Sequence, residues 1–200
     1  LHLSIRRQRQ MCIRDSSRFD AGAAVLALDE HNLSRLVEEE IEAQRPLAER
    51  QGIELRMRVL SDDTRAELDA RRVRRILRNL LSNAIDHGQG KPVEVTVAAD
   101  EDTVALTVRD HGIGLDSDQS AKVFDRFWRA DPARTRVVGG TGLGLSIALE
   151  DAKLHRGWLS AWGRPGEGAQ FRLTLPRSRD HKVLVSPLPV APTDDEGSVE

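Results

Sequence analysis

A carboxylate followed by two glycines is the most informative group of residues in this sequence that could bind a ligand: Asp110 is followed by Gly112 and Gly114. Asp110 continues the alternation of the apolar residues at 104, 106 and 108, so its side chain is expected to point into the interior. A buried carboxylate needs a partner, and a ligand amine, an arginine or a backbone amide can supply it. The glycines let the backbone approach a flat ligand or adopt a positive φ.

A second glycine-rich motif opens a predicted helix. Its candidate binding residues are Gly140, Thr141, Gly142, Leu143, Gly144 and Leu145. Glycine-rich backbone at a helix N-terminus presents N–H groups to phosphate, and the helix dipole adds to the attraction. A flexible hinge is the alternative. The motif lacks Gly-Lys-Ser/Thr, which excludes a Walker P-loop.

A polar stripe lies on the helix expected over residues 69–87. Asn79, Asn83 and Asp86 stand at positions i, i+4 and i+7, and His87 closes the helix as a candidate phosphate contact. Asparagine is a mediocre helix former, which suggests that the amides are used. An amide oxygen is a hard, neutral ligand that suits Mg²⁺, which also keeps waters and substrate phosphates. A solvated polar face is the alternative.

A loop of about 25 residues, unusually long for a compact domain, separates the two glycine motifs. It holds three of the seven aromatic residues of the chain. The three aromatic residues could pin the loop to the domain; they are Phe124, Phe127 and Trp128. The arginines of the loop could reach anionic groups; they are Arg126, Arg129, Arg134 and Arg136. The alternative is a short amphipathic helix with solvated arginines.

Periodicity predicts the elements that must position these residues. Helices are expected over 33–51, 69–87 and 143–155, and strands over 53–59, 93–97, 104–108, 158–162 and 169–175. Pro46 should bend or restart the first helix. Helices that alternate with antiparallel hairpins predict an α+β fold, a two-layer α/β sandwich with the helices on one face.

Composition excludes several classes of protein. The net charge of -2, from 30 basic and 32 acidic residues, argues against a nucleic-acid groove or an anionic membrane face. The single cysteine excludes an internal disulfide framework. No apolar run approaches the roughly 18 residues of a spanning helix, so the chain is expected to be soluble. Residues 1–16 are expected to be non-native or disordered, and 177–200 to be a disordered, Pro-rich acidic tail.

Taken together, the motifs resemble those of a known superfamily. Asn79-x-x-x-Asn83, Asp110-x-Gly112-x-Gly114 and Gly140-x-Gly142-x-Gly144 are similar, in this order, to the N, G1 and G2 boxes of the GHKL ATPases. The run 124–127 resembles the F box of histidine kinases. The resemblance covers about residues 33–176, and the stretches 69–90 and 124–133 are most similar to one actinobacterial group of sensor kinases.

The resemblance implies the Bergerat fold, with a mixed sheet and a mobile ATP lid. It also implies that Asp110 accepts a hydrogen bond from the adenine amine and that Asn83 ligates Mg²⁺. The glycines would border the phosphates of ATP. Family members often carry a basic residue at the position of Asp86 and an aromatic at that of His87. Charge compensation must therefore come from lid arginines, Arg126 and Arg129 among them, or from the metal.

Asn79 separates kinase from hydrolase within the resemblance. Hydrolysing relatives such as Hsp90 and gyrase B place a glutamate at this position, as base for a water. A neutral amide cannot remove a proton efficiently at pH 7, which favours transfer to a histidine. The alternatives are a non-catalytic nucleotide-binding module and a GHKL hydrolase.

The same resemblance predicts the organisation of the parent protein. Residues 17–30 look like the remnant of a dimerisation helix and its linker, and 31–176 form the ATP-binding domain. The acceptor histidine would lie on a dimerisation domain missing from this chain, and a response-regulator aspartate would receive the phosphoryl group. The parent is expected to be a membrane-anchored homodimer with this domain on the cytoplasmic side, and the fragment alone to show little or no autophosphorylation.

Overall fold

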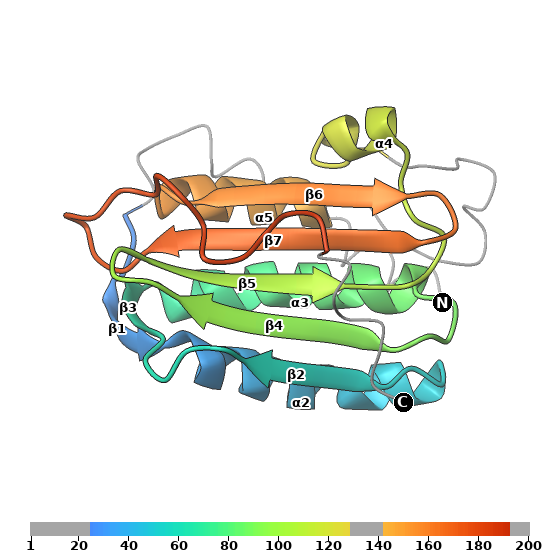
Figure 1. Ribbon diagram of the computed structural model, residues 1–200, viewed down its shortest axis with the longest axis horizontal. Coiled ribbons are helices and arrows are strands. Elements are labelled where there is room, and N and C mark those ends of the chain that lie inside the picture. Colours follow the sequence, from blue (N-terminus) through green and yellow to red (C-terminus); the bar gives the residue numbers. More distant parts are fainter. Residues whose placement is uncertain (1–24, 129–141, 193–200) are drawn as a thin grey trace, which may run out of the picture.

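The computed structural model describes residues 25–128 and 142–192. They form two layers, a five-stranded sheet and helices that cover one of its faces (Figure 1). The strands are β2 (Leu55–Val59), β4 (Val93–Ala99), β5 (Thr103–Arg109), β6 (Trp158–Arg164) and β7 (Gly168–Pro176), in the spatial order β2-β4-β5-β7-β6. β2 runs parallel to β4 and every other pair is antiparallel. The predicted two-layer α+β fold with a mixed sheet is confirmed.

The helices α2 (Leu33–Arg50), α3 (Ala70–His87) and α5 (Gly144–Leu154) lie behind the sheet in the view of Figure 1. The apolar stripe of α3 supplies the centre of the core: Val73, Ile76, Leu77, Leu80, Leu81, Ala84 and Ile85 are fully buried. Phe171 of β7 and the alternate aliphatic residues of β4 and β5 meet them from the sheet. This burial, rather than helix propensity, holds α3 in place.

The structure adds elements that periodicity did not predict. β1 (Asp29–Asn32) and β3 (Arg65–Leu68) form a separate antiparallel pair, and α4 (Ser117–Lys122) interrupts the long loop. These segments are too short, and in β1 and α4 too polar, for a period to stand out. α4 is nevertheless marked by a capping box in which Asp116 and Gln119 bond reciprocally.

The expected restart at Pro46 is wrong, because α2 continues through the proline to Arg50. Buried residues on both sides of Pro46, from Leu33 to Ala48, tie the helix to the core. Their burial offsets the hydrogen bond that proline cannot donate. None of the helices in the described parts of the chain is long and apolar enough to cross a membrane.

The chain after β7 differs from the expected disorder over residues 177–192. This segment turns back and lies on the sheet face that carries no helices, in front of β7 in Figure 1. Val183 and Leu188 are buried, at 7% and 6% exposure. The backbone of β7 already pairs with β5 and β6, so side chains of β7 bond this segment instead.

Candidate functional site

α3 places the asparagine stripe along one edge of the core. Asp69 caps its N-terminus by accepting a hydrogen bond from the backbone N–H of Arg72 at 3.1 Å. Asn79, Asn83 and Asp86 are half-buried beside the apolar stripe, and the side chain of His87 is exposed. The side chains of this stripe are therefore held by the helix and still reach the surface.

Asp110 directly follows β5 and is 2% exposed, as the parity of the strand predicted. Its Oδ1 accepts hydrogen bonds from the backbone N–H groups of Gly112 (2.9 Å) and Ala169 (3.3 Å). Burial raises the pKa of this carboxyl above its ordinary value, and the two backbone N–H groups and the nearby Arg109 oppose that shift. Among the described residues no hydrogen bond ends on Oδ2, so backbone amides satisfy one oxygen and the other can accept from a ligand.

Gly112 and Gly114 pack against protein backbone. A Cβ on Gly112 would lie 1.8 Å from the carbonyl oxygen of His87, and one on Gly114, whose φ is +75°, would lie 1.8 Å from that of Arg164. These glycines therefore allow close contacts with the end of α3 and with β6, and Gly114 adopts the positive φ that was the second expectation. The motif fixes the Asp110 loop between these two elements.

Gly168 also belongs to this arrangement, and sequence reasoning missed it. Its φ is +91°, and a Cβ there would lie 2.0 Å from the carbonyl oxygen of Asp110. Gly166 lies in the turn between β6 and β7, and Gly168 begins β7; this pair of glycines in the sequence could have indicated the close contact.

The second glycine motif lies beside Asn79, the N-terminal end of the asparagine stripe. A Cβ on Gly144 would lie 3.2 Å from Oδ1 of Asn79. Leu143 is buried, Leu145 packs against the core, and Gly142 has a φ of +68°. α3 therefore touches both motifs, with Asn79 beside Gly144 and its C-terminal end beside Gly112.

The N-terminus of α5 differs from those of the other described helices. Asn32, Asp69 and Asp116 cap α2, α3 and α4 with side-chain oxygens, whereas no side chain caps α5. The first N–H groups of a helix have no partner within the helix. At α5, within the described residues, no side-chain cap satisfies them, and this helix end lies beside Asn79.

The long loop between the two glycine motifs, the expected lid, is described as far as Trp128 and again from Gly142. Phe124 contacts Phe171 edge to face at 6.2 Å, and Trp128 packs against the core, as expected of aromatic residues that pin the loop. Phe127 differs: it is 71% exposed with a φ of +66°, although its N–H donates to the carbonyl of Gly142 at 2.9 Å. Arg126 is exposed. Five predicted residues lie outside the described part of the chain: Arg129, Arg134, Arg136, Gly140 and Thr141.

The donor set fits Mg²⁺ held mainly by a nucleotide. The described residues contain no group of three His, Cys, Asp or Glu side chains that could hold a metal. A neutral amide such as Asn83, together with phosphates and waters, is the kind of sparse site that Mg²⁺ accepts. A hollow of 330 Å³ that includes Arg56, Arg58, Glu94 and Thr96 in its lining opens on the opposite face of the sheet, away from this site.

A buried polar network anchors α5 to the first half of α3, and sequence reasoning missed it. Asp151 is fully buried and accepts hydrogen bonds from Nη1 of Arg72 (2.8 Å) and from Nε and Nη2 of Arg75 (2.6 and 2.7 Å). The Nε2 of His155 accepts from the N–H of Asp69 at 3.1 Å, which leaves Nδ1 to donate to the carbonyl of Asp151 at 2.7 Å. Burial lowers the pKa of His155. No local pattern could predict this network, because its partners are about 80 positions apart in the sequence.

Comparisons with known proteins agree with this arrangement. Residues 68–179 match the family model of histidine kinase-, DNA gyrase B-, and HSP90-like ATPases. The sensor histidine kinase MtrB of Mycobacterium leprae is 57% identical over 176 residues, which are 88% of this chain and 31% of MtrB. The chain therefore spans about a third of the length of the curated relatives it matches.

Solved structures share the fold. The full-length kinase ShkA in complex with AMPPNP is 30% identical, with a TM-score of 0.72 over 80% of this chain and 33% of ShkA. The kinase ThkA in complex with the response regulator TrrA is 22% identical, with a TM-score of 0.72 over 88% of this chain and 49% of that one. The expected similarity to an actinobacterial group of sensor kinases is confirmed by the match to MtrB.

Proposed function

Because this chain belongs to the histidine kinase-, DNA gyrase B-, and HSP90-like ATPases, as the ATP-binding catalytic domain of a sensor histidine kinase, we propose that it holds Mg-ATP along α3 as a phosphoryl donor. One observation carries this proposal. α3 touches the loop of the buried Asp110 at its C-terminal end and the uncapped N-terminus of α5 at Asn79. A base pocket and a phosphate site thus share one helix.

The adenine end of the site rests on Asp110. Oδ1 is oriented by Gly112 and Ala169, so Oδ2 is positioned to accept a hydrogen bond from the exocyclic amine of adenine. Desolvation strengthens such a bond, because the carboxylate has no bulk water to compete. A base without that amine loses the contact and leaves a buried carboxylate oxygen unpaired.

The phosphate end rests on the second glycine motif. The N–H groups at Gly144 and Leu145 and the positive end of the α5 dipole attract the phosphates, with Gly140, Thr141, Gly142 and Leu143 leading into them. Asn83 would ligate Mg²⁺, which when bound offsets phosphate charge. Asp86 cannot bind phosphate directly, so Arg126 and Arg129 of the lid would supply further positive charge, with His87 at the edge of the site.

Asn79 decides what the bound nucleotide does. It lies beside Gly144, at the phosphate end, where a glutamate would activate water. A neutral amide orients the γ-phosphoryl group without removing a proton from water. In the transfer, the bond between the γ-phosphorus and the bridging oxygen breaks as a histidine nitrogen bonds to phosphorus, and ADP leaves.

The acceptor histidine would lie on a dimerisation domain of the parent protein, and a response regulator would be the next acceptor. The relative ThkA has been solved with the response regulator TrrA, which supports such a partner. The parent would be a membrane-anchored homodimer with this domain on the cytoplasmic side. This chain spans 31% of the length of MtrB, so these features are proposals about a parent protein.

Labelling in trans tests the proposal. The chain is mixed with Mg²⁺, ATP labelled at the γ-phosphate and a dimerisation helical hairpin that bears an acceptor histidine. We expect label on the hairpin, none on a hairpin whose acceptor histidine is replaced, and little on this chain alone. Binding of ATP without label on the hairpin would indicate a non-catalytic nucleotide module, and steady release of phosphate would indicate a hydrolase. Label on histidines of this chain would also contradict the proposal.

A further inference from the structure

The outer face of the sheet, opposite the helices, carries a segment of the chain bound in an extended form. Thr174, Arg172 and Gln170 alternate along β7 and point to this face. The hydroxyl of Thr174 bonds that of Ser186 at 2.8 Å, Arg172 Nη1 donates to the carbonyl of Leu188 at 2.8 Å, and Gln170 Nε2 donates to that of Val190 at 3.1 Å. Both partners advance by two residues per contact, so the segment runs antiparallel to β7.

Two apolar side chains of this segment are buried, Val183 and Leu188, and Leu188 contacts the outer face of the sheet. Leu188 is 6% exposed and forms a small cluster with Ala98 of β4 and Ala105 of β5, separate from the main core. Ala98 and Ala105 are direct partners in the β4–β5 ladder, and their short side chains leave room for a leucine between the strands. In contrast, Leu184 earlier in the segment is 75% exposed.

The contacts resemble those of a bound peptide more than those of a sheet strand. β7 uses side chains, not its backbone, to bond the segment, and two of the three positions recognise only a backbone carbonyl. Recognition of an extended backbone with one side-chain pocket is a common mode of peptide binding. The segment also lies beyond the family match, which ends at residue 179.

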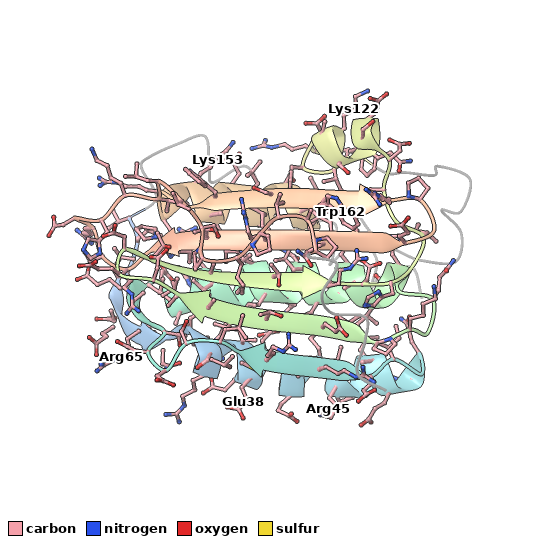
Figure 2. The ribbon with its side chains drawn as sticks, in the orientation of Figure 1. Glu38, Arg45, Arg65, Lys122, Lys153 and Trp162 are labelled. Atoms are coloured by element: carbon pink, nitrogen blue, oxygen red, sulfur yellow. The ribbon has the colours of Figure 1, made fainter. Side chains whose placement is uncertain are left out.

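Two buried guanidinium atoms beside this segment have no hydrogen-bond partner within the described residues, Nη1 of Arg109 and Nε of Arg172. Arg109 is 9% exposed, donates from Nη2 to the carbonyl of Glu167 at 2.7 Å, and lies 4.8 Å from the ring of Trp162, which is labelled in Figure 2. Burial lowers the pKa of both arginines. A carboxylate bonded to Arg109 would satisfy its buried, unpartnered N–H group. Arg109 is the ladder partner of Gln170, which bonds the segment at Val190.

We propose that the outer face of the sheet is a binding surface for an extended peptide with a buried leucine followed by a carboxylate, and that residues 183–190 occupy it as a displaceable ligand in cis. The tether keeps the cis segment at a high effective concentration, so a peptide in trans binds only when the segment is displaced or removed. This surface lies on the face of the sheet opposite α3, along which we propose that the nucleotide binds.

The test uses a chain that ends at residue 182 and a labelled peptide with the sequence of residues 183–196, which includes Asp194, Asp195 and Glu196. We expect saturable binding to the shortened chain and binding about tenfold or more weaker to the full chain. The Leu188→Asp peptide should not bind, whereas the Leu184→Asp peptide, altered at an exposed leucine, should bind as the original does. A peptide of residues 183–192, without the acidic residues, should bind more weakly and with less dependence on salt.

A second variant covers the case in which the shortened chain does not fold. Full-length Leu188→Asp should release the segment and bind the peptide, and full-length Leu184→Asp should not. A shortened chain that unfolds cooperatively but does not bind the peptide would overturn the proposal, as would equal binding to the shortened and full chains. Loss of folding in both the shortened chain and Leu188→Asp would make the segment part of the core and also overturn it. If the two peptides bind equally well, the proposed contact between a ligand carboxylate and Arg109 is wrong.

Discussion

The two halves of α3 handle polar residues in opposite ways. In the first half, Arg72 and Arg75 are bonded to the buried Asp151, and His155 joins the helix cap to the same network. In the second half, Asn79 and Asn83 are half-buried beside a helix end that no side chain caps. The first half of α3 is therefore bonded to other parts of the protein, and the second half is the part where we propose that a ligand binds.

The largest effect should come from breaking the anchored half. Asp151→Asn removes the negative charge between Arg72 and Arg75 and should lower the free energy of unfolding by about 3 kcal/mol, the low end for a buried pair because Arg75 is partly exposed. Denaturant unfolding measures this. Glu39→Gln, which removes an exposed partner of Arg35 and Arg74, is the control and should change the unfolding midpoint little. If the two variants lower the free energy of unfolding equally, the buried network does not anchor the first half of α3 more strongly than an exposed ion pair does.

Asp110→Asn should act on the ligand and not on the fold. It should weaken ATP binding by about 1.5–3 kcal/mol, the range for a hydrogen bond to a charged group. Stability without nucleotide should stay or rise at neutral pH. The pKa of Asp110 is raised by burial, so the unfolded chain ionises first and stability falls as pH rises from the ordinary carboxyl pKa through the raised one. Calorimetric titration and unfolding of the same samples measure both. Unchanged affinity would return Asp110 to a purely structural role.

Asn83→Ala should separate metal from nucleotide. The variant should still bind ATP in EDTA about as the original chain does, and it should lose most of the gain in affinity that Mg²⁺ gives. The matched substitution Asn79→Ala, one turn earlier, should keep that Mg²⁺ dependence and lower the rate of phosphoryl transfer to the hairpin. If Asn83→Ala keeps the full Mg²⁺ dependence, another residue ligates the metal.

The smallest effect should be the pH dependence of the anchored half. Burial lowers the pKa of His155, against the opposing influence of Asp69 and Asp151. A base whose pKa falls on folding contributes full stability above its unfolded value, about 6.5, and that stability is lost as the pH falls below it. His155→Gln cannot titrate and should show a shallower loss of unfolding free energy over that range. An unchanged slope in His155→Gln would contradict this prediction.

The sequence predicted the long elements because each has a buried face with a period. The stripe of α3 and the alternation of β4 and β5 indicated which way Asp110 points, and the structure confirms that it is buried. The glycine motifs were found, although Gly112 and Gly114 are required by close backbone contacts that no local pattern announces. The assignment of the site residues to adenine, phosphate and metal remains a prediction.

What the sequence did not predict depends on tertiary partners. The network of Asp151 joins residues of two helices, and only the packing of α5 on α3 brings them together. The tail from residue 177 has the prolines and charges of a disordered segment. Residues 177–192 nevertheless lie on the sheet, because three side chains of β7 bond this segment and Ala98 and Ala105 form a pocket for Leu188.

The most direct test of an anchored half and an open half is a map of backbone amide NMR signals upon titration with Mg-ATP. We predict the largest changes at Asp110–Gly114, at Leu143–Ser146 and along Asn79–His87. Signals of Asp69–Arg75 and Asp151–His155 should change little. Changes concentrated at the anchored half or on the outer face of the sheet, with none at Asp110 or Gly144, would contradict the account.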